Sequence, residues 1–180
     1  MRLLLFWLAV IGWTAAVTVH ILSLFDIDAE QIFPYIWLLH FGIFLVWVPM
    51  IFILRNEGTF KAFEDPAVRK KMNPLKFFRI LAGRTPDWVI YLALAGFIYA
   101  FINFGMTMML GDTPAVKDGQ YYLHNRGHVI RYITEAEYHY FKAIILRRFS
   151  GHWIAFFGIA AALLYPFAKP TGQHPAGLAQ

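Results

Sequence analysis

Four apolar runs with almost no charged residues dominate the sequence: 3–25, 32–54, 88–110 and 152–168. The first three have 23 residues each, and the fourth, with 17, lengthens if it is extended back through Phe149. A helix needs about 20 apolar residues to cross the hydrocarbon core of a bilayer, and a backbone in lipid must pair its own polar groups. The sequence therefore predicts an all-α integral membrane protein with four transmembrane helices, at about 3–25, 32–54, 88–110 and 149–168.

Composition supports this fold class. Only 15% of the residues are charged, whereas soluble domains contain about 25%. The first run is preceded by one base, Arg2, and exceeds the roughly 7–15 apolar residues of a signal peptide, so we expect it to be retained as a helix. We expect residues 1–180 to form a single polytopic membrane domain.

Several kinds of chemistry are excluded or weakly supported. The chain has no cysteine, which excludes disulfides, thiolate metal sites, iron–sulfur clusters and thiol catalysis. It also lacks the common hydrolase, metalloprotease and phosphate-binding motifs. The sequence leaves catalysis open but favours a protein that is not an enzyme.

The charges between the runs predict an orientation. Residues 26–31 contain three acids and no base, whereas residues 55–86 contain eight Lys or Arg and three acids. Because positive loops stay in the cytoplasm, we expect a cytoplasmic basic loop at 55–87 and both termini inside, with 26–31 and 111–151 outside. The expected location is the inner (cytoplasmic) membrane.

The basic loop has helix-start signals of its own. Asp65-Pro66 and Asn73-Pro74 each combine a capping residue with proline at the first helical position. The second of these helices is basic and amphipathic, which is typical of a helix lying in the membrane interface. We expect contacts with lipid headgroups or a partner at Lys70, Lys71 and Arg79.

The outer segment, 111–148, is the longest stretch outside the runs. Aromatic and β-branched residues on both sides of Asn125-Arg126-Gly127 predict a short β-hairpin. Thr134 and Glu137 have the spacing of a capping box and predict an amphipathic helix, bent at Ser150-Gly151 before the fourth span. A hairpin alone is marginally stable, so we expect it to rest on the helices or on a partner. We expect Arg126 and Arg131 to contact lipid headgroups or an acidic partner surface.

Potential cofactor ligands gather towards the outer ends of the spans. His20, His40, His152 and Met106 occupy the outer parts of four different helices. Ionisable groups inside a membrane are candidates for function, and imidazole and thioether groups can bind haem b or copper. The alternative is that these side chains only pack and hydrogen-bond between helices. A weaker metal hypothesis pairs His124 with His128 across the hairpin turn, which supplies only half of a zinc site.

Three functions remain open. The first is a non-enzymatic accessory or scaffold subunit of a larger membrane assembly, with other membrane subunits or further copies of the chain as partners. The second is a redox protein that binds haem b or copper, and the third is a protein that binds lipid headgroups. Membrane lipid is an expected partner in each, and nucleic acid in none.

Overall fold

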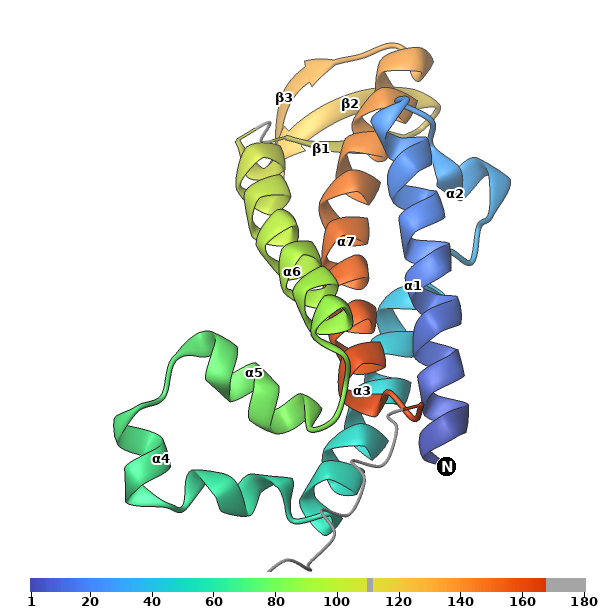
Figure 1. The fold of residues 1–180 in the computed structure, drawn as a ribbon. Coiled ribbons are helices and arrows are strands. Elements are labelled where there is room, and N and C mark those ends of the chain that lie inside the picture. The colour runs from blue at the N-terminus through green and yellow to red at the C-terminus, as the bar shows by residue number, and fades with distance from the viewer. Residues whose placement is uncertain (110–111, 168–180) are drawn as a thin grey trace, which may run out of the picture.

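The computed structural model of the chain describes residues 1–109 and 112–167. Most of these residues are helical, with one small sheet (Figure 1). The expected span ends at Leu110 and Ala168, and Gly111, lie outside the described residues. The elements are α1 (Arg2–Leu24), α2 (Ala29–Ile32), α3 (Leu38–Asn56), the 3-10 helix η1 (Thr59–Phe63), α4 (Pro66–Lys70), α5 (Pro74–Ala82), α6 (Asp87–Met108), β1 (Thr113–Lys117), β2 (Gln120–Asn125), β3 (His128–Tyr132) and α7 (Glu135–Leu164).

Three helices, α1, α3 and α6, are long and apolar enough to cross a membrane. Each buries only one side in the structure and exposes large apolar side chains elsewhere. Phe41, Leu45 and Phe101, for example, are 64%, 72% and 65% exposed. In water such surfaces would be costly, whereas in a bilayer they face hydrocarbon.

The fourth apolar run is the C-terminal half of α7, a single helix of 30 residues. α7 continues without interruption through Ser150-Gly151, so the amphipathic helix and the fourth run, expected as separate elements, are one helix. α7 packs against α1, α3 and α6 and provides the centre of the core, where Trp153 and Leu146 are fully buried.

Glycines allow the helices to approach α7 closely. A Cβ added at Gly12 of α1 would lie 2.6 Å from the Phe157 ring, and one added at Gly151 would lie 2.6 Å from Asn103 Nδ2 of α6. Such distances are too short for carbon contacts, so a side chain at either position would have to displace the Phe157 ring or the Asn103 amide. Small residues at helix contacts are typical of membrane bundles, where tight packing stabilises association.

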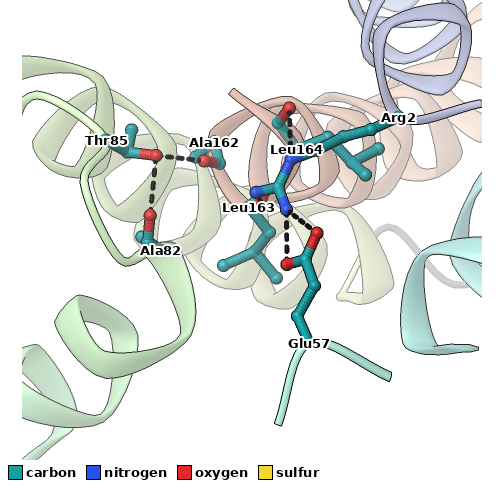
Figure 2. A network of polar contacts seen from close by, with 7 residues as sticks. All are labelled: Arg2, Glu57, Ala82, Thr85, Ala162, Leu163 and Leu164. Atoms are coloured by element: carbon teal, nitrogen blue, oxygen red, sulfur yellow. Dashed lines mark hydrogen bonds and ion pairs between the residues drawn. The ribbon is translucent and has the colours of Figure 1, made fainter. Parts of the chain in front are cut away.

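The C-terminal end of α7 is capped by groups from distant parts of the chain (Figure 2). Arg2 donates from Nη2 to the Leu163 carbonyl at 2.8 Å and from Nε to the Leu164 carbonyl at 3.3 Å, while Nη1 contacts both Glu57 carboxylate oxygens at 2.7 and 2.6 Å. Thr85 Oγ1 lies 2.8 Å from the Ala162 carbonyl and 2.9 Å from the Ala82 carbonyl, so its single proton is shared between the two. The last carbonyls of a helix lack partners within it, so Arg2 satisfies two of them and Thr85 contributes to a third.

The small sheet has three antiparallel strands in the order β1-β2-β3. The expected hairpin is β2 and β3, and its turn places Arg126 and Gly127 at φ 47° and 85°, as a two-residue turn of this kind requires. The structure adds β1, joined to β2 through Asp118 and Gly119, which also have positive φ. β1 and β2 contact α7, so the hairpin rests on the helix as expected.

The segments that connect the long helices lie at the two opposite ends of the bundle. The sheet, the C-terminal end of α6 and the segment around α2 lie at one end, named the sheet end here, and the N-terminus, α4 and α5 lie at the other (Figure 1). Asp65, Asn73 and Thr134 cap α4, α5 and α7 with their side chains, as the sequence predicts. α4 and α5 extend sideways from the bundle, with Phe78 of α5 packed on the core.

Candidate functional site

The acidic residues that follow α1 pair with basic residues on α7 at the sheet end. Asp28 is the most deeply placed, with its side chain 3% exposed. These contacts hold the connection between α1 and α3 against the N-terminal half of α7, so the three acids serve as intramolecular partners. The pairs are Asp26–Arg147 at 2.9 Å, Asp28–His139 at 2.9 Å and Glu30–Lys142 at 2.6 Å.

His20 lies at the centre of a buried polar cluster between three helices. Its Nδ1 is 2.8 Å from Ser150 Oγ of α7, and its Nε2 is 2.5 Å from the Tyr99 hydroxyl of α6. His20 and Ser150 are 4% and 0% exposed, whereas Tyr99 is 41% exposed. We call these three residues the histidine triad. It is a line of hydrogen bonds from the interior of the bundle to its apolar surface.

Two directions of hydrogen bonding fit this line. In the first, Tyr99 donates to His20 Nε2, His20 donates from Nδ1 to Ser150 Oγ, and Ser150 donates to the Arg147 carbonyl at 3.2 Å. In the second, Ser150 donates to His20 Nδ1 and His20 donates from Nε2 to Tyr99, which leaves the Tyr99 proton available. Each direction corresponds to one neutral tautomer of His20.

The triad is surrounded by side chains that donate hydrogen bonds to main-chain carbonyls of α6, α7 and α1. Asn103 Nδ2 donates to the Arg147 carbonyl at 2.9 Å, and Arg148 donates to the Thr107 carbonyl at 2.6 Å. Arg147 donates to the Ser23 carbonyl as well as pairing with Asp26. The cluster joins α1, α6 and α7 with polar contacts at the level where the sequence placed cofactor ligands.

The other proposed cofactor ligands lie in separate surroundings. His40 Nδ1 accepts from Trp153 Nε1 at 3.2 Å, and His152 Nδ1 lies 3.0 Å from the Arg148 carbonyl, with its ring 4.8 Å from the Phe104 ring. Met106 is 66% exposed on α6. Each of the three histidines thus contacts a different set of groups.

Ligation of a metal by His20 would require rearrangement. Both ring nitrogens of His20 have hydrogen-bond partners, so one of those bonds must break before His20 can bind iron or copper. Within residues 1–109 and 112–167, no group of three or more His, Asp or Glu side chains is arranged to hold a metal ion. The haem and copper hypothesis stays a prediction from the sequence.

The basic residues of the sheet differ in whether they have partners within the chain. Arg131 pairs with Glu137 at 2.9 Å and lies over the Phe141 ring at 6.0 Å, so it stabilises the junction with α7. Arg126 and His128 are exposed at the turn, and in the part of the chain that the structure describes Arg126 forms no ion pair. His124 lies on β2, with His128 at the start of β3.

The start of α7 has a complete capping box. Thr134 Oγ1 accepts from the Glu137 backbone N–H, and the Glu137 carboxylate accepts from the Thr134 N–H at 2.9 Å. The hydrogen bond from the Thr134 backbone, together with that from Arg131, holds the pKa of Glu137 below its ordinary value. This confirms the helix start that the Thr-x-x-Glu spacing predicts.

The basic residues at the opposite end divide into two kinds. Arg79 pairs with Asp87 at 2.9 Å and donates to the Thr85 carbonyl at 2.6 Å, which fixes α5 to the start of α6. Lys70 and Lys71 are exposed at the end of α4. Arg79 thus has partners within the chain although its side chain is 47% exposed, and headgroup contact stays a prediction for Arg79, Lys70 and Lys71.

Comparison of the chain with protein-family models, with curated proteins and with solved structures found no match. Function has to be argued from the residues alone. The sequence singled out His20 but missed its partners, Tyr99 and Ser150, because the apolar runs give no indication of which polar side chains face one another. It also missed Asn103, the one amide within the third run, which is itself a signal that could have been used.

Proposed function

We propose that the protein is a non-enzymatic integral membrane protein that acts by binding, as an accessory or scaffold subunit of a larger membrane assembly. In this proposal α7 is a fourth span beside α1, α3 and α6. The membrane is the inner one, with the N-terminus, α4 and α5 on the cytoplasmic side and the sheet on the outer side. The eight basic residues of 55–86 support that orientation through the preference of positive loops for the cytoplasm.

The observation that carries this proposal is the exposure of β3. All five of its residues are exposed, including the apolar residues Val129, Ile130 and Tyr132 at 51%, 54% and 66%. Exposed apolar side chains on α1, α3 and α6 are explained by lipid, but β3 belongs to the sheet beyond the helix ends (Figure 1). Exposed apolar groups in such a place are typical of a protein contact surface.

The test is the size of the native assembly after the β3 surface is made charged. We expect the double variant Val129→Asp/Ile130→Asp to migrate as the single chain on native gels of membranes from its own source, where the wild type migrates as a larger complex. Val116→Asp on β1 is the matched control, because Val116 is 52% exposed in the same sheet. The proposal fails if the wild type already runs as a single chain, or if the control dissociates equally.

A second candidate function, binding of anionic lipid headgroups, is favoured by the segment from η1 to α5. Lys70 and Lys71 are exposed there, and Phe60, Leu75 and Phe77 are 40%, 45% and 42% exposed in the same segment. Exposed bases beside exposed apolar side chains suit the membrane interface. We expect Lys70→Gln/Lys71→Gln to weaken binding to vesicles that contain phosphatidylglycerol. Equal binding to neutral vesicles would exclude this function.

The haem or copper alternative stays open to a direct test. An optical spectrum of the purified protein, together with iron and copper analysis, decides it. A Soret band that His20→Phe removes would support it, and a colourless protein without either metal would exclude it.

A further inference from the structure

A narrow apolar groove runs between α1 and α6, with α7 as its floor. Its volume is about 210 Å³. Phe6 and Trp13 of α1 and Trp88 of α6 form its walls, whereas Gly96 of α6 and Gly158 of α7 leave room between them. The groove opens sideways from three helices whose exposed surfaces are apolar, so its contents would come from the bilayer.

The histidine triad is not part of the groove lining but lies on the same seam between α1, α6 and α7, displaced towards the sheet end. Tyr99 follows Gly96 by three residues on α6, and His20 follows Trp13 by seven on α1, spacings that keep the side chains on one face of a helix. Ser150 precedes Ile154, a floor residue, by four. The same seam therefore has an apolar section and, roughly 5 Å further along α6, a polar group at its edge.

The chemistry of the triad limits what that polar group could recognise. Tyr99 can accept a hydrogen bond when it donates to His20, and it can donate one when His20 donates to it. It can thus bind either a hydroxyl or a carbonyl group. Tyr99 is nine residues from the end of α6, roughly 14 Å along the helix, a depth at which a charged headgroup is costly.

The size of the groove limits the ligand further. Pockets that enclose a drug-sized ligand have volumes of about 300–1,000 Å³, so 210 Å³ holds only part of such a molecule. The remainder must lie in lipid. These limits describe a neutral, membrane-dissolved molecule with a carbonyl or hydroxyl head and an apolar tail.

We propose that the groove and the histidine triad form a binding site for a membrane quinone and its quinol. The quinone carbonyl accepts from Tyr99, and the quinol hydroxyl donates to Tyr99. The two forms select the two hydrogen-bond directions of the triad. The site shares no residue with β3, so its failure and the failure of the accessory-subunit proposal are distinguishable.

The experiment uses the full chain in phosphatidylcholine nanodiscs titrated with short-tailed ubiquinone. Trp13 and Trp88 line the groove, so bound quinone should quench part of the tryptophan emission in a saturable manner, and ubiquinol should compete. Gly96→Leu fills the groove and should abolish the saturable quenching. Tyr99→Phe keeps the ring but loses the hydroxyl, and should weaken the binding of both forms about tenfold.

The matched control is Gly105→Leu on the same helix, because a Cβ at Gly105 meets nothing within 4 Å. It should bind quinone as the wild type does. If wild type and Gly96→Leu are quenched equally, the quinone only partitions into the bilayer and the proposal is overturned. If Tyr99→Phe lowers the thermal stability but binds both forms normally, the triad only joins helices and the proposal is likewise overturned.

Discussion

Gly151→Ala tests whether the contact between α6 and α7 depends on the absence of a side chain at that position. The new methyl carbon would lie 2.6 Å from Asn103 Nδ2, which donates to the Arg147 carbonyl. Overpacking costs about 1–3 kcal/mol, and a displaced hydrogen bond adds about 0.5–1.5 kcal/mol. Alanine in place of glycine inside a helix stabilises the fold by about 0.5–1 kcal/mol, which offsets part of this cost. We expect a net destabilisation of about 2 kcal/mol.

Removal of the obstructing side chain should rescue the variant. Asn103→Ala alone should cost about 1–2 kcal/mol for the lost hydrogen bond and packing. In the double variant the methyl group introduced by Gly151→Ala enters the space left by the Asn103 side chain, so the double variant should be no less stable than Asn103→Ala. The double-mutant cycle therefore predicts a coupling of about 2 kcal/mol between the two positions.

The assay is reversible unfolding in mixed micelles, followed by circular dichroism, with Gly105→Ala as the control. Gly105 is also within a helix, but a Cβ there meets nothing within 4 Å, so its replacement should be neutral or stabilising. The reasoning is refuted if Gly151→Ala is as stable as Gly105→Ala, or if the costs of Gly151→Ala and Asn103→Ala simply add.

Three further predictions concern the ends of α7. Arg2→Met should destabilise the fold by about 2 kcal/mol in the same unfolding assay, because two carbonyls lose a charged donor. Glu57→Gln should cost less than about 1 kcal/mol, because the ion pair between Arg2 and Glu57 is partly exposed. Equal costs for the two variants would contradict this account. Thr85→Val should cost about 1 kcal/mol and increase amide exchange at the end of α7, and unchanged exchange would argue against the cap. Because the pKa of Glu137 is lowered in the fold, its ionised carboxylate stabilises the protein fully above the ordinary glutamate pKa, and this stabilisation is lost as the pH falls through the lowered pKa. The stability difference between wild type and Glu137→Gln should therefore shrink towards about pH 3. A constant difference would refute the role of the charge.

Features that depend on neighbouring residues were predicted from the sequence. The capping box at Thr134 and the turn at Arg126-Gly127 are both in the structure, because each requires only a few residues in a local geometry. β1 was missed because Thr113–Lys117 contains Pro114 and lacks an alternating apolar pattern. Asp118-Gly119 is a turn signal that could have revealed it.

The contacts between helices were not predicted. Ser150-Gly151 was interpreted as a bend, because serine and glycine weaken helices locally. In the structure Gly151 is the point of closest approach to Asn103, and Ser150 is fully buried against His20. The same two residues thus have a role in contacts between helices, which no local pattern could distinguish from a break.

The contacts along α7 indicate where binding can occur without disturbing the fold. At the sheet end the acids after α1 pair with its bases, and at the other end Arg2 and Thr85 satisfy its last carbonyls. Polar groups that already have partners inside the chain gain little from a ligand, because binding would exchange one hydrogen bond for another. Tyr99 and Val129 are 41% and 51% exposed, whereas His20 is 4% exposed and the Arg147 side chain 21%. Substitution at Tyr99 and at Val129 therefore separates binding from stability more cleanly than substitution at His20 or Arg147.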